Sequence, residues 1–152
     1  MGRTVVPFSG PYTATKFATE AMAESLLYEL HGSGVDVTIL QAGGFPTEIL
    51  DKIESAGDPD RVDSMQALKE RSDGLWQQWF TMLETAAPSP DLVADAMVNL
   101  VEAAPGQRPL RVVVDPVTGG DATEAVNRTC TDVQKDLLTG IGFADVLPTP
   151  MP

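Results

Sequence analysis

A tyrosine and a lysine four residues apart could carry out proton transfer. Tyr12 and Lys16 stand at the start of a helix-forming segment, and this spacing places two side chains on one face of a helix. A free phenol titrates near pH 10, but a nearby ammonium favours the phenolate and lowers the pKa of a phenol. The pair could therefore act as a general acid/base. Because the spacing arises by chance in roughly a quarter of chains this long, the pair alone decides little.

The residues around this pair carry a wider pattern. Residues 9–18 read SGPYTATKFA, and the motifs Glu24-Ser25-Leu26 and Gly34-Val35-Asp36-Val37-Thr38 follow downstream. Together they resemble the active-site region of the short-chain dehydrogenase/reductase family. The resemblance implies that Tyr12 is the catalytic acid/base, and that Lys16 assists it and binds the nicotinamide ribose. Hydride would then pass between a nicotinamide and a carbonyl or alcohol carbon.

A glycine-rich loop extends the resemblance, which covers at least residues 2–115. Residues 42–47 read AGGFPT, similar to the family's Pro-Gly-x-x-x-Thr stretch with Ala42 in place of the usual proline. This replacement leaves the loop backbone freer. The resemblance implies NAD or NADP as cofactor, without distinguishing them. The residues that it implies for cofactor binding are Lys16, Gly43, Gly44, Phe45 and Thr47.

Two features of the family are missing from the sequence. The family's catalytic serine is expected about a dozen residues before Tyr12, just ahead of Met1, and Ser9 lies too close to Tyr12 to replace it simply. No glycine-rich fingerprint opens a strand-turn-helix, since Gly32-Ser33-Gly34 ends a predicted helix and Gly140-Ile141-Gly142 follows one. No helix N-terminus is therefore expected to receive a pyrophosphate. The sequence therefore predicts only the catalytic half of the family's fold, and leaves open whether this chain alone binds a cofactor.

The elements that must position these residues follow from periodicity. Apolar residues recur at helical spacing over residues 12–31, and further helices are predicted from Leu75, Ser89 and Gly119, with helical pieces within residues 48–72. The runs 35–40 and 110–114 are rich in β-branched residues and predict buried strands. This order predicts an α/β fold, the C-terminal part of a Rossmann-like doubly wound fold that is helix-rich with about two parallel strands. We expect one truncated domain over residues 1–146 and a proline-rich tail over residues 147–152.

Two strands are too few for an ordinary parallel sheet, so completion by oligomerisation is expected. In relatives the helix after the tyrosine packs against its counterpart in another subunit. The apolar positions of helix 12–31 spread widely, and Glu20, Glu24 and His31 form a narrow polar edge, which predicts burial on two sides. We therefore expect a homo-oligomer that forms through this helix.

Composition limits the remaining partners. The net charge of −12 disfavours nucleic acid and anionic membranes. No apolar run could cross a bilayer, and the N-terminus resembles no secretion signal. Cys130 is the only cysteine. A cytoplasmic protein with a small-molecule substrate is therefore expected. The acidic stretch Glu48, Asp51, Glu54, Asp58, Asp60 and Asp63 lacks the spacing of metal ligands, and no metal site is predicted. The expected substrate pocket contains Ser9, Trp76, Trp79 and Phe80, although packing explains the aromatic residues equally well.

Three functions remain open from the sequence. The first is an NAD(P)-dependent oxidoreductase whose nucleotide-binding half comes from a longer chain or another polypeptide. The second is a cofactor-free catalyst that uses Tyr12 and Lys16 for proton transfer, isomerisation or dehydration. The third is a non-catalytic association module, which charges at Met22 or Leu26 would dissociate. The sequence identifies neither the substrate nor the number of subunits.

Overall fold

The computed structural model describes residues 2–48, 52 and 57–147. The chain divides into two compact units, one formed by Met1–Gly43 with Asp91–Pro152 and the other by Gly44–Pro90.

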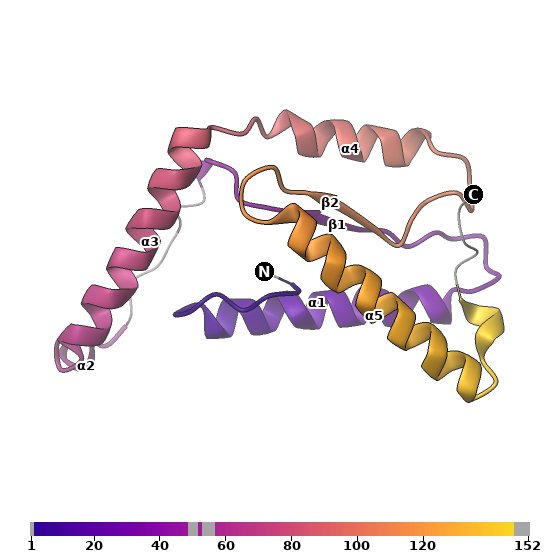
Figure 1. The fold of residues 1–152 in the computed structure, drawn as a ribbon, viewed down its shortest axis with the longest axis horizontal. Coiled ribbons are helices and arrows are strands. Elements are labelled where there is room, and N and C mark those ends of the chain that lie inside the picture. Colours follow the sequence, from indigo (N-terminus) through magenta and orange to yellow (C-terminus); the bar gives the residue numbers. More distant parts are fainter. Residues whose placement is uncertain (1, 49–51, 53–56, 148–152) are drawn as a thin grey trace. The chain divides into compact units, whose positions relative to one another are not determined.

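The first unit is built on a two-stranded parallel sheet. β1 (Ile39–Ala42) pairs with β2 (Arg111–Val114) in a register that places Ile39 opposite Arg111 and Ala42 opposite Val114. α1 (Gly10–Glu29) and α5 (Gly120–Gly140) lie on one face of this sheet, and α4 (Asp91–Glu102) lies on the other (Figure 1). Helices on both faces are the usual cover of a parallel sheet. The predicted fold class, a partial Rossmann-like α/β arrangement with two parallel strands, is confirmed.

Strand alternation sorts the side chains between the two faces. Successive side chains of a strand point to opposite faces, so Gln41 and Arg111 share the face covered by α1 and α5. Hydrogen bonds from Gln41 to Glu20 of α1 and between Gln41 and Asn127 of α5 agree with this assignment. The sheet therefore meets α1 through polar side chains.

The first strand begins later than predicted. The run 35–40 predicted a strand, but the ladder comprises Ile39–Ala42. The reason lies in side-chain bonds: Asp36 accepts from the backbone N–H of Gly106 at 2.9 Å, and the Thr38 hydroxyl donates to the Pro109 carbonyl at 2.9 Å. The residues before Ile39 thus connect to the chain before β2 through side chains.

The second unit contains α2 (Pro59–Asp63) and α3 (Gln66–Ala86). The Asp58 carboxylate accepts from the backbone N–H of Arg61 at 3.0 Å and so caps α2. The helix predicted from Leu75 already begins at Gln66. Within the predicted acidic stretch, Asp51 and Glu54 lie outside the described residues, as does the tail beyond Leu147. The prediction of a single domain stays a prediction.

Candidate active site

Tyr12 and Lys16 lie together on the first turns of α1. The Lys16 Nζ atom is 5.3 Å from the centroid of the Tyr12 ring, within the range of a cation–π contact. Both side chains are exposed, with 53% of Tyr12 accessible. The predicted pair is therefore brought together and stays open to a small molecule.

Ser9 has a different environment. It is 7% exposed, its hydroxyl donates to the Val6 carbonyl at 2.6 Å, and its Oγ lies 2.9 Å from the Thr13 Oγ1 atom. Thr13 is also buried, at 4% exposure. The Ser9 hydroxyl thus ties the preceding turn to the buried face of α1, and its membership of a substrate pocket stays a prediction.

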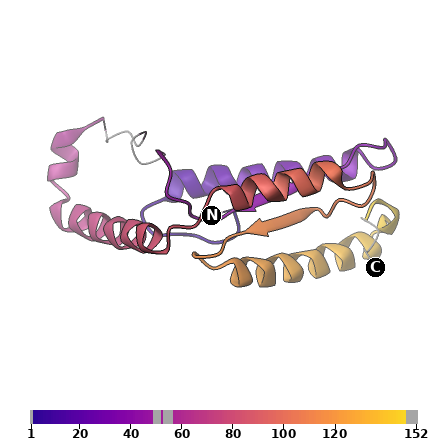
Figure 2. The same cartoon turned by 90° about the horizontal axis from the view of Figure 1, so that it is seen from above.

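The Tyr12 end of α1 lies where ligands of parallel sheets bind. The first turn of α1, the carboxyl ends of β1 and β2 and the first turn of α5 share one end of the first unit in both views (Figures 1 and 2). In open α/β sheets, ligands bind beyond the carboxyl ends of the strands. Gly43, a predicted cofactor-binding residue, follows β1 at this end.

Asp115 organises the loop that follows β2. Its Oδ1 atom accepts from the backbone N–H groups of Val117 at 3.2 Å and Thr118 at 2.6 Å, and its Oδ2 atom accepts from the Thr118 hydroxyl at 2.7 Å. A Cβ placed on Gly43 would overlap this carboxylate and lie 2.6 Å from the Asp115 Cβ. The loops after the two strands therefore touch, and glycine is required at position 43.

The other predicted residues belong to the second unit. Gly44 and Phe45 are half-buried, and Thr47 is exposed. On α3, Trp76 stacks on Phe80 with ring centroids 5.9 Å apart, and meets Trp79 edge to face at 6.4 Å. These three predicted pocket residues are half-buried and pack on one another.

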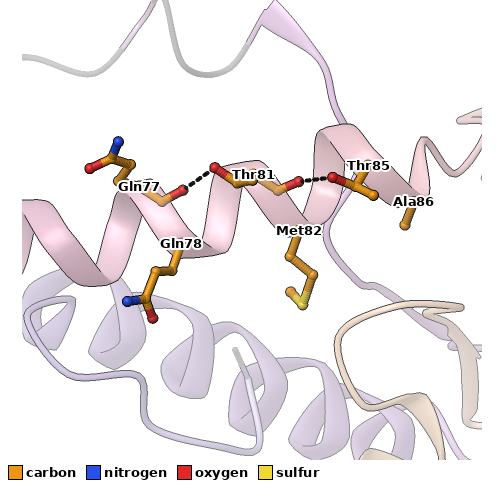
Figure 3. Close-up of a pocket in the computed structure, with 6 residues that line it drawn as sticks. All are labelled: Gln77, Gln78, Thr81, Met82, Thr85 and Ala86. Atoms are coloured by element: carbon orange, nitrogen blue, oxygen red, sulfur yellow. Dashed lines mark hydrogen bonds between the residues drawn. The ribbon is translucent and has the colours of Figure 1, made fainter.

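An open pocket on α3 has a different lining. Figure 3 shows its six residues, in which the hydroxyls of Thr81 and Thr85 donate to the carbonyls one turn earlier. None of the three aromatic residues is among them; the pocket is lined by Gln77, Gln78, Thr81, Met82, Thr85 and Ala86.

The face of α1 that packs on the sheet is polar. Glu20 is 6% exposed, and its carboxylate accepts from the Arg111 Nε atom at 3.2 Å. Arg111 also donates to Glu24, and Arg3 lies 3.6 Å from Glu20 and 3.5 Å from Glu24. The polar edge of Glu20 and Glu24 thus faces the protein, because two guanidinium groups neutralise its charge.

Most apolar positions of α1 face outward instead. Among them, Met22 is 73% and Leu26 is 44% exposed. Burial of this helix on two sides, as its sequence predicted, does not occur within the single chain. His31 is exposed beyond the end of α1.

Tyr28 extends the polar cluster along α1. Its hydroxyl donates to the Glu24 carboxylate at 3.3 Å. Burial, and then the negative charge of Glu24, raise the pKa of Tyr28 above its ordinary value. This phenol is therefore held in its protonated form and is distinct from the exposed Tyr12.

A second polar link joins the chain segments before the two strands. The Arg108 guanidinium donates to the Asp36 carboxylate at 2.7 Å and to the carbonyls of Leu100 and Ala103 at the end of α4. The backbone N–H of Gly106, and then Arg108, lower the pKa of Asp36 below its ordinary value. This link was not predicted from the sequence, but Asp36 and Arg108 each precede the paired residues Ile39 and Arg111 by the same interval.

Metal and membrane features are not found in the described part of the chain. Within residues 2–48, 52 and 57–147, no group of three or more His, Cys, Asp or Glu side chains could hold a metal ion. No helix formed by these residues is both long and apolar enough to span a membrane.

The fold and the site together define a class of protein. A parallel sheet lies between layers of helices, and a tyrosine–lysine pair stands at its carboxyl end, as in a Rossmann-like α/β chain with a candidate acid/base.

Comparison with known proteins specifies the class further. The chain is 34% identical over 77 residues to the mouse protein "short-chain dehydrogenase/reductase family 9C member 7", a match that covers 51% of this chain and 20% of the relative. It is 42% identical over 53 residues to the "NADPH-dependent 3-dehydrocapnine reductase" of Ornithobacterium rhinotracheale, covering 35% and 19%. It is 42% identical over 45 residues to the mitochondrial "D-beta-hydroxybutyrate dehydrogenase" of Rattus norvegicus, covering 30% and 13%.

These matches support a chain of the short-chain dehydrogenase/reductase type over the part that they cover. The matched segments span about a fifth or less of the length of these three relatives. No family model matches the sequence.

Proposed function

We propose that this chain provides the acid/base pair and part of the nicotinamide site of an NAD(P)-dependent oxidoreductase. The observation that carries the proposal is the Lys16 Nζ atom 5.3 Å from the Tyr12 ring, at the carboxyl end of a parallel sheet. Tyr12 exchanges a proton with the oxygen of a carbonyl or alcohol substrate. Lys16 assists Tyr12 and donates to the ribose hydroxyls. A bound nicotinamide supplies or accepts the hydride.

The exposed groups of the first unit fit such a ligand. Tyr12 and Lys16 offer accessible donors, and Gly43 follows β1 at the same end of the sheet. Cofactor contacts of Gly44, Phe45 and Thr47, and substrate-binding roles for Ser9, Trp76, Trp79 and Phe80, stay predictions. The relatives named as reductases and dehydrogenases support redox chemistry, and one is named as NADPH-dependent. A cytoplasmic location stays a prediction.

Binding of reduced nicotinamide mononucleotide to the 152-residue chain tests the proposal. This probe contains the nicotinamide and its ribose but no adenosine, and its fluorescence reports binding. Lys16→Met should weaken binding on the order of tenfold, because it removes charged hydrogen bonds to the ribose. Lys135→Met, on the exposed surface of α5, is the matched control and should bind as the wild type does.

Hydride transfer to a panel of small carbonyl compounds, with NADPH or NADH, tests the role of Tyr12. Tyr12→Phe should keep the affinity for the mononucleotide and abolish reduction, since it removes only the proton donor. Equal mononucleotide affinity in the wild type and Lys16→Met, or full reduction by Tyr12→Phe, contradicts the proposal.

A second function, self-association through α1, is favoured by the exposure of its apolar side chains. Met22 and Leu26 lie on the surface while the buried face holds Glu20, and the partner that we propose is a second copy of this chain. Met22→Glu should lower the mass measured by light scattering to that of one chain, whereas Thr131→Glu on exposed α5 should leave it unchanged. A wild type that is already monomeric at high concentration contradicts this function.

A further inference from the structure

Gly43 and Asp115 occupy equivalent places after the two strands. Ala42 pairs with Val114, and the backbone N–H of Gly43 donates to the Val114 carbonyl at 2.9 Å. The next residues in this register are Gly43 and Asp115. The two loops therefore leave the sheet side by side, and whatever fixes one of them can fix the other.

The Asp115 side chain has a fixed position. Both of its oxygens accept hydrogen bonds from the loop that follows, namely from two backbone N–H groups and from the Thr118 hydroxyl. Hydrogen bonds to a charged acceptor are stronger than those between neutral groups. Three such bonds leave the carboxylate little rotational freedom. The carboxylate therefore has a fixed position against one side of Gly43.

Glycine stands on two sides of this residue. A Cβ at Gly43 would overlap the Asp115 carboxylate, and a Cβ at Gly120 would lie 2.5 Å from the Asp115 carbonyl oxygen. The loop after β1 and the first residue of α5 therefore both close on Asp115. In contrast, a Cβ at Gly74, within α3, would meet nothing within 4 Å.

We propose that Asp115 is a positioning residue that sets the backbone of Gly43, and through it the start of the loop that presents nicotinamide-binding groups. This inference rests on the proposed function. The Gly43 backbone cannot shift toward β2 while the carboxylate is in place, so its orientation toward the ligand is determined before binding. In this role Asp115 would act through Gly43 and not by contact with the cofactor or the substrate.

A double-mutant cycle in the full chain tests the inference, with reduced nicotinamide mononucleotide as the probe. Gly43→Ala and Asp115→Gly should each weaken its binding on the order of tenfold, because small displacements of a positioning group are costly. The double variant should bind the probe at least as tightly as the single variant with the lower affinity, since both changes act on one contact. Asp115→Asn keeps the shape and one acceptor oxygen and should retain most of the affinity. Gly74→Ala is the glycine control and should bind as the wild type does.

Hydrogen exchange separates this inference from the proposed function. The Gly43 amide should exchange faster in Asp115→Gly while the amides of α4 keep their wild-type rates. Suppose that the wild type binds the probe. The inference is then overturned if the two single losses of affinity multiply in the double variant, or if the exchange rate of the Gly43 amide is unchanged in Asp115→Gly. A wild type that does not bind the probe overturns the proposed function itself, and the inference with it.

Discussion

Arg111 of β2 and Glu20 of α1 form an ion pair of 3.2 Å, with side chains only 6% and 8% exposed. The pair joins two elements that are 91 residues apart in the chain. A buried ion pair adds little over an apolar pair of the same shape, but removing one partner leaves the other charge buried and unpaired. Matched charges therefore hold α1 to the sheet, and the contribution of this ion pair to stability depends on both Arg111 and Glu20.

Arg111→Ala should lower the free energy of unfolding by about 3–5 kcal/mol, because Glu20 and Glu24 would share only the Arg3 guanidinium and one buried negative charge would be left unbalanced. Urea unfolding followed by circular dichroism measures the change. Arg128→Ala provides the control, since the Arg128–Glu124 pair is exposed and 3.8 Å long and should change stability by less than about 1 kcal/mol. Replacement of Arg111 by Met together with Glu20 by Leu should recover most of the loss. Equal effects of Arg111→Ala and Arg128→Ala would show that the pair is not buried.

Stability should fall at alkaline pH through Tyr28. Its pKa is raised by burial and by Glu24, so its stabilising effect is fully present below the ordinary pKa near 10 and is lost as the pH rises through the folded-state pKa. Since the chain has two tyrosines, absorbance at 295 nm in a Tyr12→Phe background follows Tyr28 alone. Ionisation should occur above pH 10 in the folded protein and return to about 10 in urea. A folded-state midpoint at or below the urea value would disprove the assignment.

Local patterns predicted α1 and α5 closely but misplaced the starts of α3 and β1. The apolar spacing of residues 12–31 and the glycines near residue 119 identified α1 and α5, because helix boundaries depend on nearby residues. The run 35–40 misplaced the first strand, since β-branched composition does not show that Asp36 binds Arg108. The strand bounds alone also do not give the register, in which Ile39 pairs with Arg111 and Ala42 with Val114.

The candidate site shows the same division. Tyr12 and Lys16 were predictable because one helical turn joins them. The burial of Glu20 was not predictable. Periodicity assigns a charged residue to the exposed face of a helix, and the partner that allows its burial, Arg111, lies in a distant strand. From the sequence alone, such a carboxylate could be hydrated at the surface or paired with an arginine inside. Only the tertiary fold, which brings the arginine near, distinguishes the two.

Acid should weaken the link between Asp36 and Arg108. The Gly106 N–H and Arg108 lower the pKa of Asp36, so its stabilising effect is present above the ordinary pKa near 4 and is lost as the pH falls through the lower folded-state value. Asp36→Asn should therefore reduce the loss of stability between about pH 5 and pH 2, measured as the change in thermal midpoint. Asp132→Asn, on exposed α5, is the control. An Asp36→Asn variant with the full acid dependence of the wild type would contradict this account.

Phe8 should be replaceable by glycine with a gain in stability. The backbone N–H of Ser9 donates to the Val6 carbonyl at 3.3 Å, and Phe8 is the third residue of this turn, with a φ of 63°. Glycine is favoured at positive φ in such turns. The Phe8 side chain is 42% exposed, and we expect the strain that glycine relieves to exceed the packing that is lost. Phe8→Gly should therefore raise the free energy of unfolding by about 1 kcal/mol.

The reverse change at Gly34 provides the matched control for Phe8→Gly. Gly34 has a φ of 81° and nothing within 4 Å of an added Cβ, so Gly34→Ala introduces backbone strain without a clash. It should lower the free energy of unfolding by about 1 kcal/mol. Urea midpoints of both variants measure the two effects. If Phe8→Gly lowers the midpoint while Gly34→Ala behaves as expected, the ring of Phe8 contributes more than its strained backbone removes.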